Sequence, residues 1–229
     1  MNRKVIKIVI GDIRFQWKYG IYFLYLVISV FYIFALSMLK GNVKSIVKMI
    51  LILSDPATMG MFFMGAIVLL EKSQRVLNSI AVSPVRPLQY LSAKVCSIGI
   101  VSVVVGIIIG VAAEKSNLLM IGISTLLASI IFSLCGLIVG AVTKSLNQYI
   151  VATMPFEIIG FGPLIAYLIG ERNPIIWYQP CTIAYRLIEG NYKNLTIEIF
   201  VLFVYIIVLT VICHTFIVRM FQRVGGVKL

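Results

Sequence analysis

Long, mostly apolar runs alternate with short polar segments along the whole chain. The first run holds 19 uncharged residues, which would rise about 28 Å as a helix. That length is close to the roughly 30 Å hydrocarbon thickness of a bilayer. The pattern predicts an all-α integral membrane protein, with one transmembrane domain over residues 1–229. Its six expected spans are residues 21–39, 46–70, 95–113, 118–142, 148–169 and 197–218.

The longest polar interruption in the first half of the chain is residues 71–94. Its start is typical of an amphipathic helix at a membrane surface. The apolar positions are Val76, Leu77, Ile80 and Ala81, and the polar positions are Glu71, Lys72, Gln74, Arg75 and Asn78. Pro84 and Pro87 should end this helix, because proline lacks an amide donor and restricts the residue before it. We therefore expect a short surface helix, a turn, and re-entry into the membrane near Leu88.

Residues 1–20 are basic and amphipathic, with large apolar side chains between the cations. This pattern favours a short helix on the cytoplasmic leaflet, with Trp17 and Tyr19 at the interface. The alternative is a disordered basic leader. We expect no cleavable signal peptide, because the apolar run that follows is too long and lacks a small-residue cleavage site.

Proline and glycine interrupt two of the predicted spans. Asp55-Pro56 would either kink the second span or restart it as a new helix, and the sequence leaves both open. The fifth span should be broken at Pro155, Gly160, Gly162 and Pro163.

Two GxxxG pairs predict close helix packing. They are Gly106 with Gly110 in span three and Gly136 with Gly140 in span four. Small residues let helix backbones approach closely in lipid. The short link Glu114–Asn117 should make these two spans an antiparallel hairpin.

The composition agrees with a membrane protein, since 61% of residues are hydrophobic and only 12% are charged. Soluble domains carry roughly 25% charged residues. The net charge of +12 could suggest nucleic acid, but the aromatic residues lie inside the apolar runs and form no basic, aromatic platform. We therefore expect no nucleic-acid partner and assign the cations to topology.

Lysine and arginine are unequally divided between the two predicted sides of the membrane. The side with both termini, residues 71–94 and Lys144 carries 13 of them, against 7 on the other side. Such an excess marks the cytoplasmic side. Both termini and residues 71–94 are therefore predicted to be cytoplasmic.

Motifs for enzyme chemistry are missing from the sequence. The single histidine, His214, excludes a zinc site that needs two histidines, and there is no phosphate-binding GxxxxGK[ST] loop. The four cysteines form neither a disulfide framework nor a CxxC site. We therefore predict no catalytic residues, no metal site and no cofactor on this chain.

Glu157 is the one acid deep in a predicted span. A carboxylate inside a membrane is costly and suggests a substrate or proton path. Alternatively, the breaks in the fifth span would place Glu157 near the outer surface, in water.

Residues 71–94 resemble the segment between spans two and three of type-2 ABC exporter permeases. The matching positions are Glu71, Leu77, Val82, Pro84, Pro87, Tyr90 and Lys94. QPCTIAYRLIEG (179–190) is similar to an element before the last span of that family, through Pro180, Thr182 and Tyr185. Here Gln179 replaces the usual asparagine, and Arg186 lies earlier than the usual basic position.

The resemblance implies a half-transporter in a bacterial cell membrane. Two permease chains, alike or different, would work with two ATPase subunits that bind ATP and Mg²⁺. Residues 155–196 would form external re-entrant helices, and 71–94 would hold a cytoplasmic coupling helix that docks on the ATPase. The implied contact residues are Glu71, Lys72, Gln74, Arg75, Leu77, Val82 and Pro84.

The size of the chain and its segment DPATMGMFFMGAIVLLEK (55–72) look most like fluoroquinolone-type drug exporters. The cargo could equally be lipid-like or a peptide, moved outward by alternating access. The alternatives are a carrier or pore without an ATPase, and a membrane protein that confers immunity to a bacteriocin.

Overall fold

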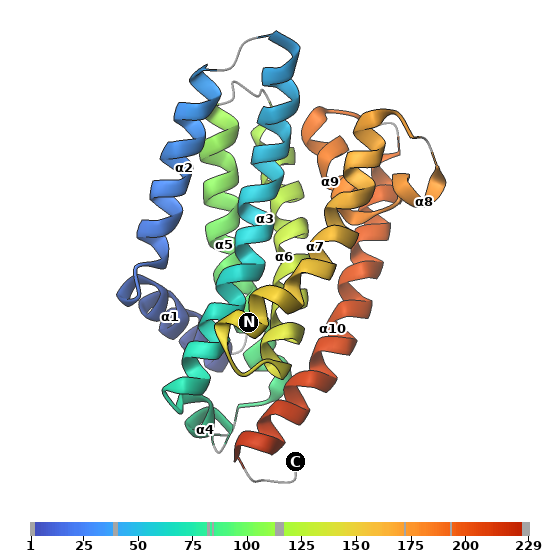
Figure 1. Cartoon of the computed structure of the whole chain (residues 1–229). Helices are drawn as coiled ribbons and strands as arrows, with labels where there is room; N and C mark the ends of the chain where they lie inside the picture. Colours follow the sequence, from blue (N-terminus) through green and yellow to red (C-terminus); the bar gives the residue numbers. More distant parts are fainter. Residues whose placement is uncertain are drawn as a thin grey trace.

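The computed structural model describes residues 3–38, 41–81, 83, 85–112, 117–171, 173–192 and 194–225, and all regular structure in these residues is helical (Figure 1). The helices are α1 (Arg3–Lys18), α2 (Ile21–Met38), α3 (Gly41–Ser73), α4 (Val76–Ala81), α5 (Pro87–Ala112), α6 (Leu118–Val142), α7 (Leu146–Ile169), α8 (Pro174–Trp177), α9 (Pro180–Glu189) and α10 (Leu195–Gly225).

Four of the described helices are long and apolar enough to cross a membrane: α5, α6, α7 and α10. The pair α1 and α2 would count as a fifth, bent by 65° at its break. Predicted spans four to six lie within these helices. The first and third spans also do, except for residues 39 and 113, which lie outside the described residues. α5 begins at Pro87, earlier than the expected start at 95, and α10 continues to Gly225.

Helix α6 lies at the centre of the bundle, packed by α3, α5, α9 and α10. It is apolar on every side and buried along most of its length, as expected for a helix surrounded by others. Hydroxyl groups add polar links inside the bundle. Ser102 of α5 lies 2.7 Å from Ser129 of α6, and Ser124 donates a hydrogen bond to the Ala184 carbonyl of α9.

Both glycine pairs lie at close helix contacts, which confirms the packing prediction. A Cβ atom added at Gly106 would come within 2.8 Å of the Thr125 side chain on α6. One added at Gly136 would come within 2.7 Å of the Met61 carbonyl oxygen on α3. The backbones of α3, α5 and α6 therefore approach one another only because these positions lack a side chain.

At residues 55 and 56 the structure excludes one of the two expected outcomes, and in the fifth span the predicted break is wrong. α3 continues as one helix past residues 55 and 56, so a helix restart is excluded there, and the side chains of that pair lie outside the described residues. α7 contains Pro155 and Pro163 within a single helix. Proline removes one backbone hydrogen bond, and neighbouring helices in a membrane bundle make that loss tolerable.

The amino-terminal segment is helical, so the disordered leader is excluded. Val5 and Val9 of α1 pack against Ala93 of α5. Gln16 of α1 donates a hydrogen bond to the Ser97 hydroxyl at 3.1 Å. α1 therefore lies across the base of α5, and Gly20, with a φ of 69°, turns the chain into α2.

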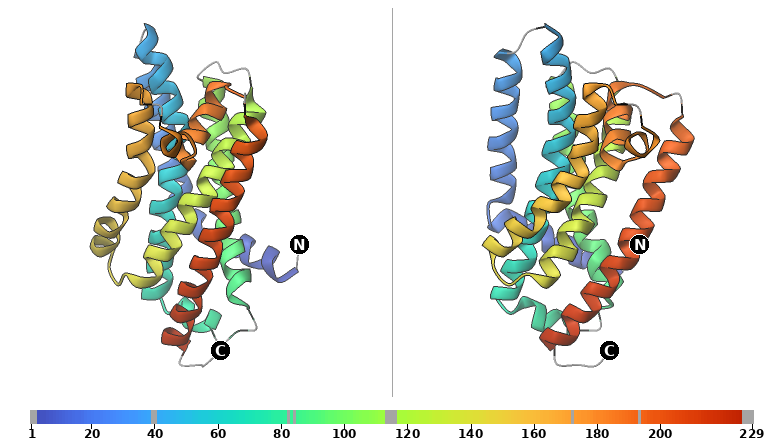
Figure 2. Two further views of the ribbon diagram at one scale, coloured as in Figure 1. Left: turned by 90° about the vertical axis from the view of Figure 1, so that its right-hand side faces the viewer. Right: turned by 45° about the vertical axis from the view of Figure 1, so that its right-hand side comes forward.

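The short helices mark the two ends of the bundle. The view in Figure 1 places α1, α4 and the last turns of α10 toward one end, and α8 and α9 toward the other. The two turned views of Figure 2 show the same arrangement. We call these the α4 end and the α9 end.

Candidate functional site

The turn between α3 and α4 differs from the single surface helix that the sequence predicts. Glu71 and Lys72 belong to the last turn of α3, and only residues 76–81 form the separate helix. Arg75 adopts a left-handed backbone with a φ of 57°. A non-glycine residue there is uncommon, and it reorients the chain so that the apolar side of α4 faces the bundle.

Helix α4 presents one side to the protein and one to solvent. Leu77 is completely buried, and α4 packs against the carboxyl-terminal half of α10. Gln74, Arg75 and Asn78 are exposed, and the Gln74 amide donates a hydrogen bond to the Tyr19 hydroxyl. Of the implied contact residues, Val82 and Pro84 lie outside the described residues.

Glu71 is buried, although the sequence predicted it to be exposed. Lys94 of α5 lies 2.5 Å from Glu71 Oε1 and 2.6 Å from Asp12 Oδ1 of α1. The Tyr90 hydroxyl donates to Glu71 Oε2 at 2.7 Å. We call Asp12, Glu71, Tyr90 and Lys94 the charged cluster. It connects α1, the end of α3 and the start of α5.

The charged cluster was missed because its members are far apart in sequence. The motif did single out Glu71, Tyr90 and Lys94, but without assigning them to one another. Asp12 lay unnoticed among the cations of the basic leader. The signal that could have suggested the cluster was Lys94, the last charge before a long apolar run. A charge at such a position is expected to be buried, and a buried charge needs a partner of opposite sign.

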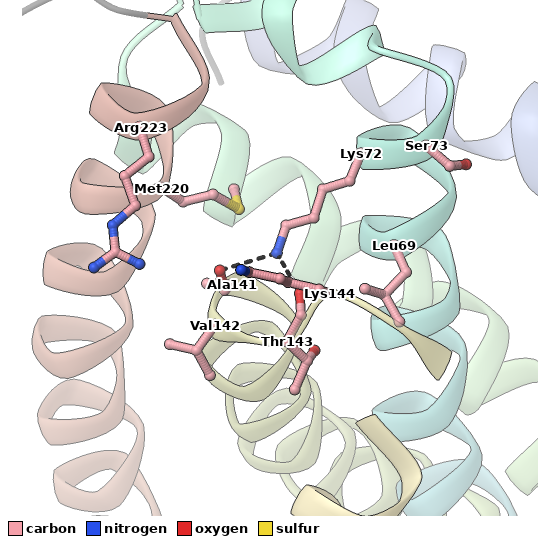
Figure 3. Close-up of a pocket in the computed structure, with 9 residues that line it drawn as sticks. All are labelled: Leu69, Lys72, Ser73, Ala141, Val142, Thr143, Lys144, Met220 and Arg223. Atoms are coloured by element: carbon pink, nitrogen blue, oxygen red, sulfur yellow. Dashed lines mark hydrogen bonds between the residues drawn. The ribbon is translucent and has the colours of Figure 1, made fainter. Parts of the chain in front are cut away.

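Lys72 is half-buried rather than freely exposed. Its ammonium donates hydrogen bonds to the carbonyls of Gly140, Ala141 and Thr143, at 2.6, 2.9 and 2.9 Å. Figure 3 shows the bonds to Ala141 and Thr143. These carbonyls belong to the last turn and end of α6, where helical carbonyls have no partner within the helix. Lys72 thus holds the end of α3 against the end of α6.

The α9 end has its own buried ion pair. Arg186 Nη2 of α9 lies 2.6 Å from Glu198 Oε1 of α10. The Arg186 guanidinium also lies 4.0 Å from the centre of the Trp177 ring, a cation–π contact. From the sequence, Arg186 stood out only because it lies earlier than the usual basic position of the resembling family. The sequence did not predict Glu198 or Trp177 as its partners.

Gln179 caps the amino terminus of α9, in place of the asparagine usual in the resembling family. Its side-chain oxygen accepts a hydrogen bond from the Thr182 amide at 3.1 Å. Its amide nitrogen donates to the Gly160 carbonyl of α7 at 2.7 Å. The motif QPCTIAYRLIEG therefore begins with a helix cap that also fixes α9 to α7.

Glu157 lies partly buried in the middle of α7. Its Oε1 is shielded from solvent and has no hydrogen bond to the described residues. The structure brings neither Arg186 nor another cation of the described chain into an ion pair with it. Within the described residues, no three His, Cys, Asp or Glu side chains could together hold a metal ion.

The sequence matches the Fluoroquinolones export permease protein family over residues 3–225, nearly its whole length. The chain belongs to this family. Two relatives are the fluoroquinolones export permease proteins of Mycobacterium tuberculosis strains CDC 1551 / Oshkosh and ATCC 25618 / H37Rv. Each is 23% identical over 142 residues, which cover 61% of this chain and 60% of the relative.

Membership in this family confirms the resemblance to type-2 ABC exporter permeases. The chain is a multi-pass membrane protein of a permease family, which comprises transport subunits rather than enzymes. The alignment spans less than two thirds of the length of these curated relatives.

Proposed function

We propose that this chain is the membrane-spanning subunit of an ATP-driven exporter, with six spans in a bacterial cell membrane. The spans would be α2, α3, α5, α6, α7 and α10, which alternate in direction in Figure 1. α3 and α10 have 33 and 31 residues, or about 50 and 46 Å, and so exceed a bilayer core of roughly 30 Å. Their shared α4 end would stand in the cytoplasm, as the excess of Lys and Arg supports.

The observation that carries this proposal is the construction of the α4 end. α4 is small and exposed on one side, yet Leu77 anchors it to the bundle. Immediately before it, the charged cluster ties the end of α3 to α1 and α5. A push on α4 by a partner would therefore move several helices as one body. Gln74 and Arg75 supply exposed contact groups, with Asn78 beside them.

The proposed partner is an ABC ATPase subunit, present in two copies beside two permease chains. ATP and Mg²⁺ would bind to that partner, and closure of the ATPase pair would switch the spans between inward- and outward-facing states. α8 and α9 would then form the external re-entrant element. Because the Mycobacterium relatives are named for fluoroquinolone export, we propose an amphipathic, drug-like cargo, with lipid-like and peptide cargoes as alternatives.

Co-expression with the ATPase subunit encoded nearest to this chain tests the proposal. We expect the two proteins to co-purify from detergent in a 1:1 ratio, with ATPase activity. Arg75→Glu should reduce co-purification at least several-fold, whereas Glu171→Lys, a charge reversal at an exposed position of the α9 end, should not. A permease that purifies alone beside a well-folded ATPase would contradict the proposal.

A carrier without an ATPase is the second candidate, and Glu157 is the observation that favours it. Its Oε1 lacks a hydrogen bond to the described residues, which suits an atom that receives a proton or a cationic cargo. Export that continues without the ATPase, follows the proton gradient and disappears in Glu157→Gln would support the carrier.

A further inference from the structure

A cavity of about 380 Å³ opens between the ends of α3, α6 and α10 (Figure 3). Three cationic side chains line it: Lys72, Lys144 and Arg223. No carboxylate lines it among the described residues. Glu71, next to Lys72 in the sequence, and Asp12, at the same end of the bundle, both form ion pairs with Lys94. The cavity therefore has a positive charge that this part of the protein does not neutralise.

Lys72 and the other two cations have different roles in this cavity. The three donors of the Lys72 ammonium are occupied by carbonyls at the end of α6, where the helix dipole is negative. Lys72 thus offsets the negative end of the α6 dipole, which would otherwise repel an anion. Lys144 and Arg223 are exposed and have no side-chain hydrogen bond within the described residues, so their donors can reach a ligand.

The position of the Lys72 ammonium is unfavourable for its charge when no anion is bound. Burial, with the Arg223 guanidinium nearby, lowers the pKa of the Lys72 ammonium to about 8. A bound anion would oppose this shift, because an opposite charge within a few ångströms favours the charged form.

We propose that this cavity binds a phosphate group, the chemistry that anionic lipid headgroups and soluble phosphate esters share. Arginine and lysine together suit phosphate oxygens. Basic pockets between transmembrane helices on the cytoplasmic side bind anionic lipid headgroups.

Apolar residues beside the cations favour a lipid as the source of the phosphate. Leu69, Val142 and Met220 line the same cavity, and Val142 is 51% exposed. A lipid would place its headgroup on Lys144 and Arg223 and its glycerol and upper acyl chains along this apolar wall. The site is distinct from the exposed side of α4 and does not require the proposed ATPase partner.

Native mass spectrometry of the purified full chain tests this site, with phosphatidylglycerol and phosphatidylcholine as lipid probes. We expect preferential retention of phosphatidylglycerol. The double variant Lys144→Gln/Arg223→Gln should weaken it roughly five-fold for each cation removed. Lys72 is left unchanged because it caps α6. The matched control is Arg86→Gln/Arg219→Gln, which removes two exposed cations outside the cavity and should retain the lipid.

The two sources of phosphate are separated by a competition arm with inorganic phosphate and glycerol 3-phosphate. Displacement of phosphatidylglycerol only by another anionic lipid supports the lipid source. Binding of the soluble phosphates to the wild-type chain, lost in the cavity variant, supports a phosphate site with a soluble ligand. Two results would overturn the proposal. One is an equal loss of phosphatidylglycerol in both double variants. The other is a wild-type chain that retains phosphatidylglycerol no better than phosphatidylcholine and binds neither soluble phosphate. Thermal unfolding of each variant in detergent verifies that it is folded.

Discussion

Lys94 is the residue on which the α4 end depends most, because it binds carboxylates from two other helices. Lys94→Met would leave Asp12 and Glu71 buried without a cation. Loss of one partner from a buried pair costs about 3–5 kcal/mol, so we expect a large fall in unfolding temperature. Glu71→Gln should lower the stability less, since the glutamine oxygen can still accept a hydrogen bond from the Tyr90 hydroxyl. Equal unfolding temperatures for wild type and Lys94→Met would contradict the cluster's structural role.

Lys72 should give the stability of the protein a pH dependence of known sign. Its pKa in the folded protein is about 8, below the ordinary lysine value of about 10.4. The unfolded chain therefore binds more protons between these values, and stability should rise with pH through this window. We expect the rise in detergent without anionic lipid, and a smaller rise in Lys72→Gln. Lys144→Gln is the exposed control; an unchanged slope in Lys72→Gln would contradict the assignment.

At the scale of helices, the contact between α3 and α6 depends on the absence of a side chain at Gly136. In Gly136→Ala the new Cβ would lie 2.7 Å from the Met61 carbonyl and 3.0 Å from the Tyr149 hydroxyl. Such overpacking costs about 1–3 kcal/mol. Gly162→Ala in α7 meets nothing within 4 Å and should be neutral or stabilising. Thermal unfolding of both variants in the same detergent distinguishes them; equal behaviour would contradict the packing account.

The helices could be predicted from sequence more completely than their breaks. Apolar run length identified the membrane-capable helices, because a bilayer demands a minimum length. The periodicity at Val76, Leu77 and Ile80 identified α4. Periodicity could not show that Arg75 adopts a left-handed turn, which moved Glu71 into α3. Nor could it show that α7 stays whole through Pro155, since that depends on the surroundings of the helix.

At the scale of the whole molecule, the candidate site is formed by residues that sequence reasoning treats separately. Asp12, Glu71 and Lys94 come from three helices, and only the fold shows that they meet. The cavity at Lys144 and Arg223 likewise joins the ends of three helices. The family motif located the right segment, but its residues divide between exposed groups such as Arg75 and internal ones such as Glu71 and Leu77.

The account also predicts a functional difference between the two ends of the molecule. The α4 end would move with the ATPase through α4, whose apolar side is fixed by Leu77. The α9 end, held by the Arg186–Glu198 pair, would face the outside and touch no ATPase. Each end has an exposed position from which a partner could be detected: Asn78 on α4 and Glu189 on α9.

Photo-crosslinking from these two positions tests the central claim most directly. A photoreactive amino acid at position 78 or 189 of the full chain, co-expressed with the ATPase encoded nearest to it, reports which end the partner touches. The account predicts a crosslink to the ATPase from position 78 and none from position 189. A crosslink from 189, or none from 78 in a complex that still co-purifies, would show that α4 is not where the ATPase docks.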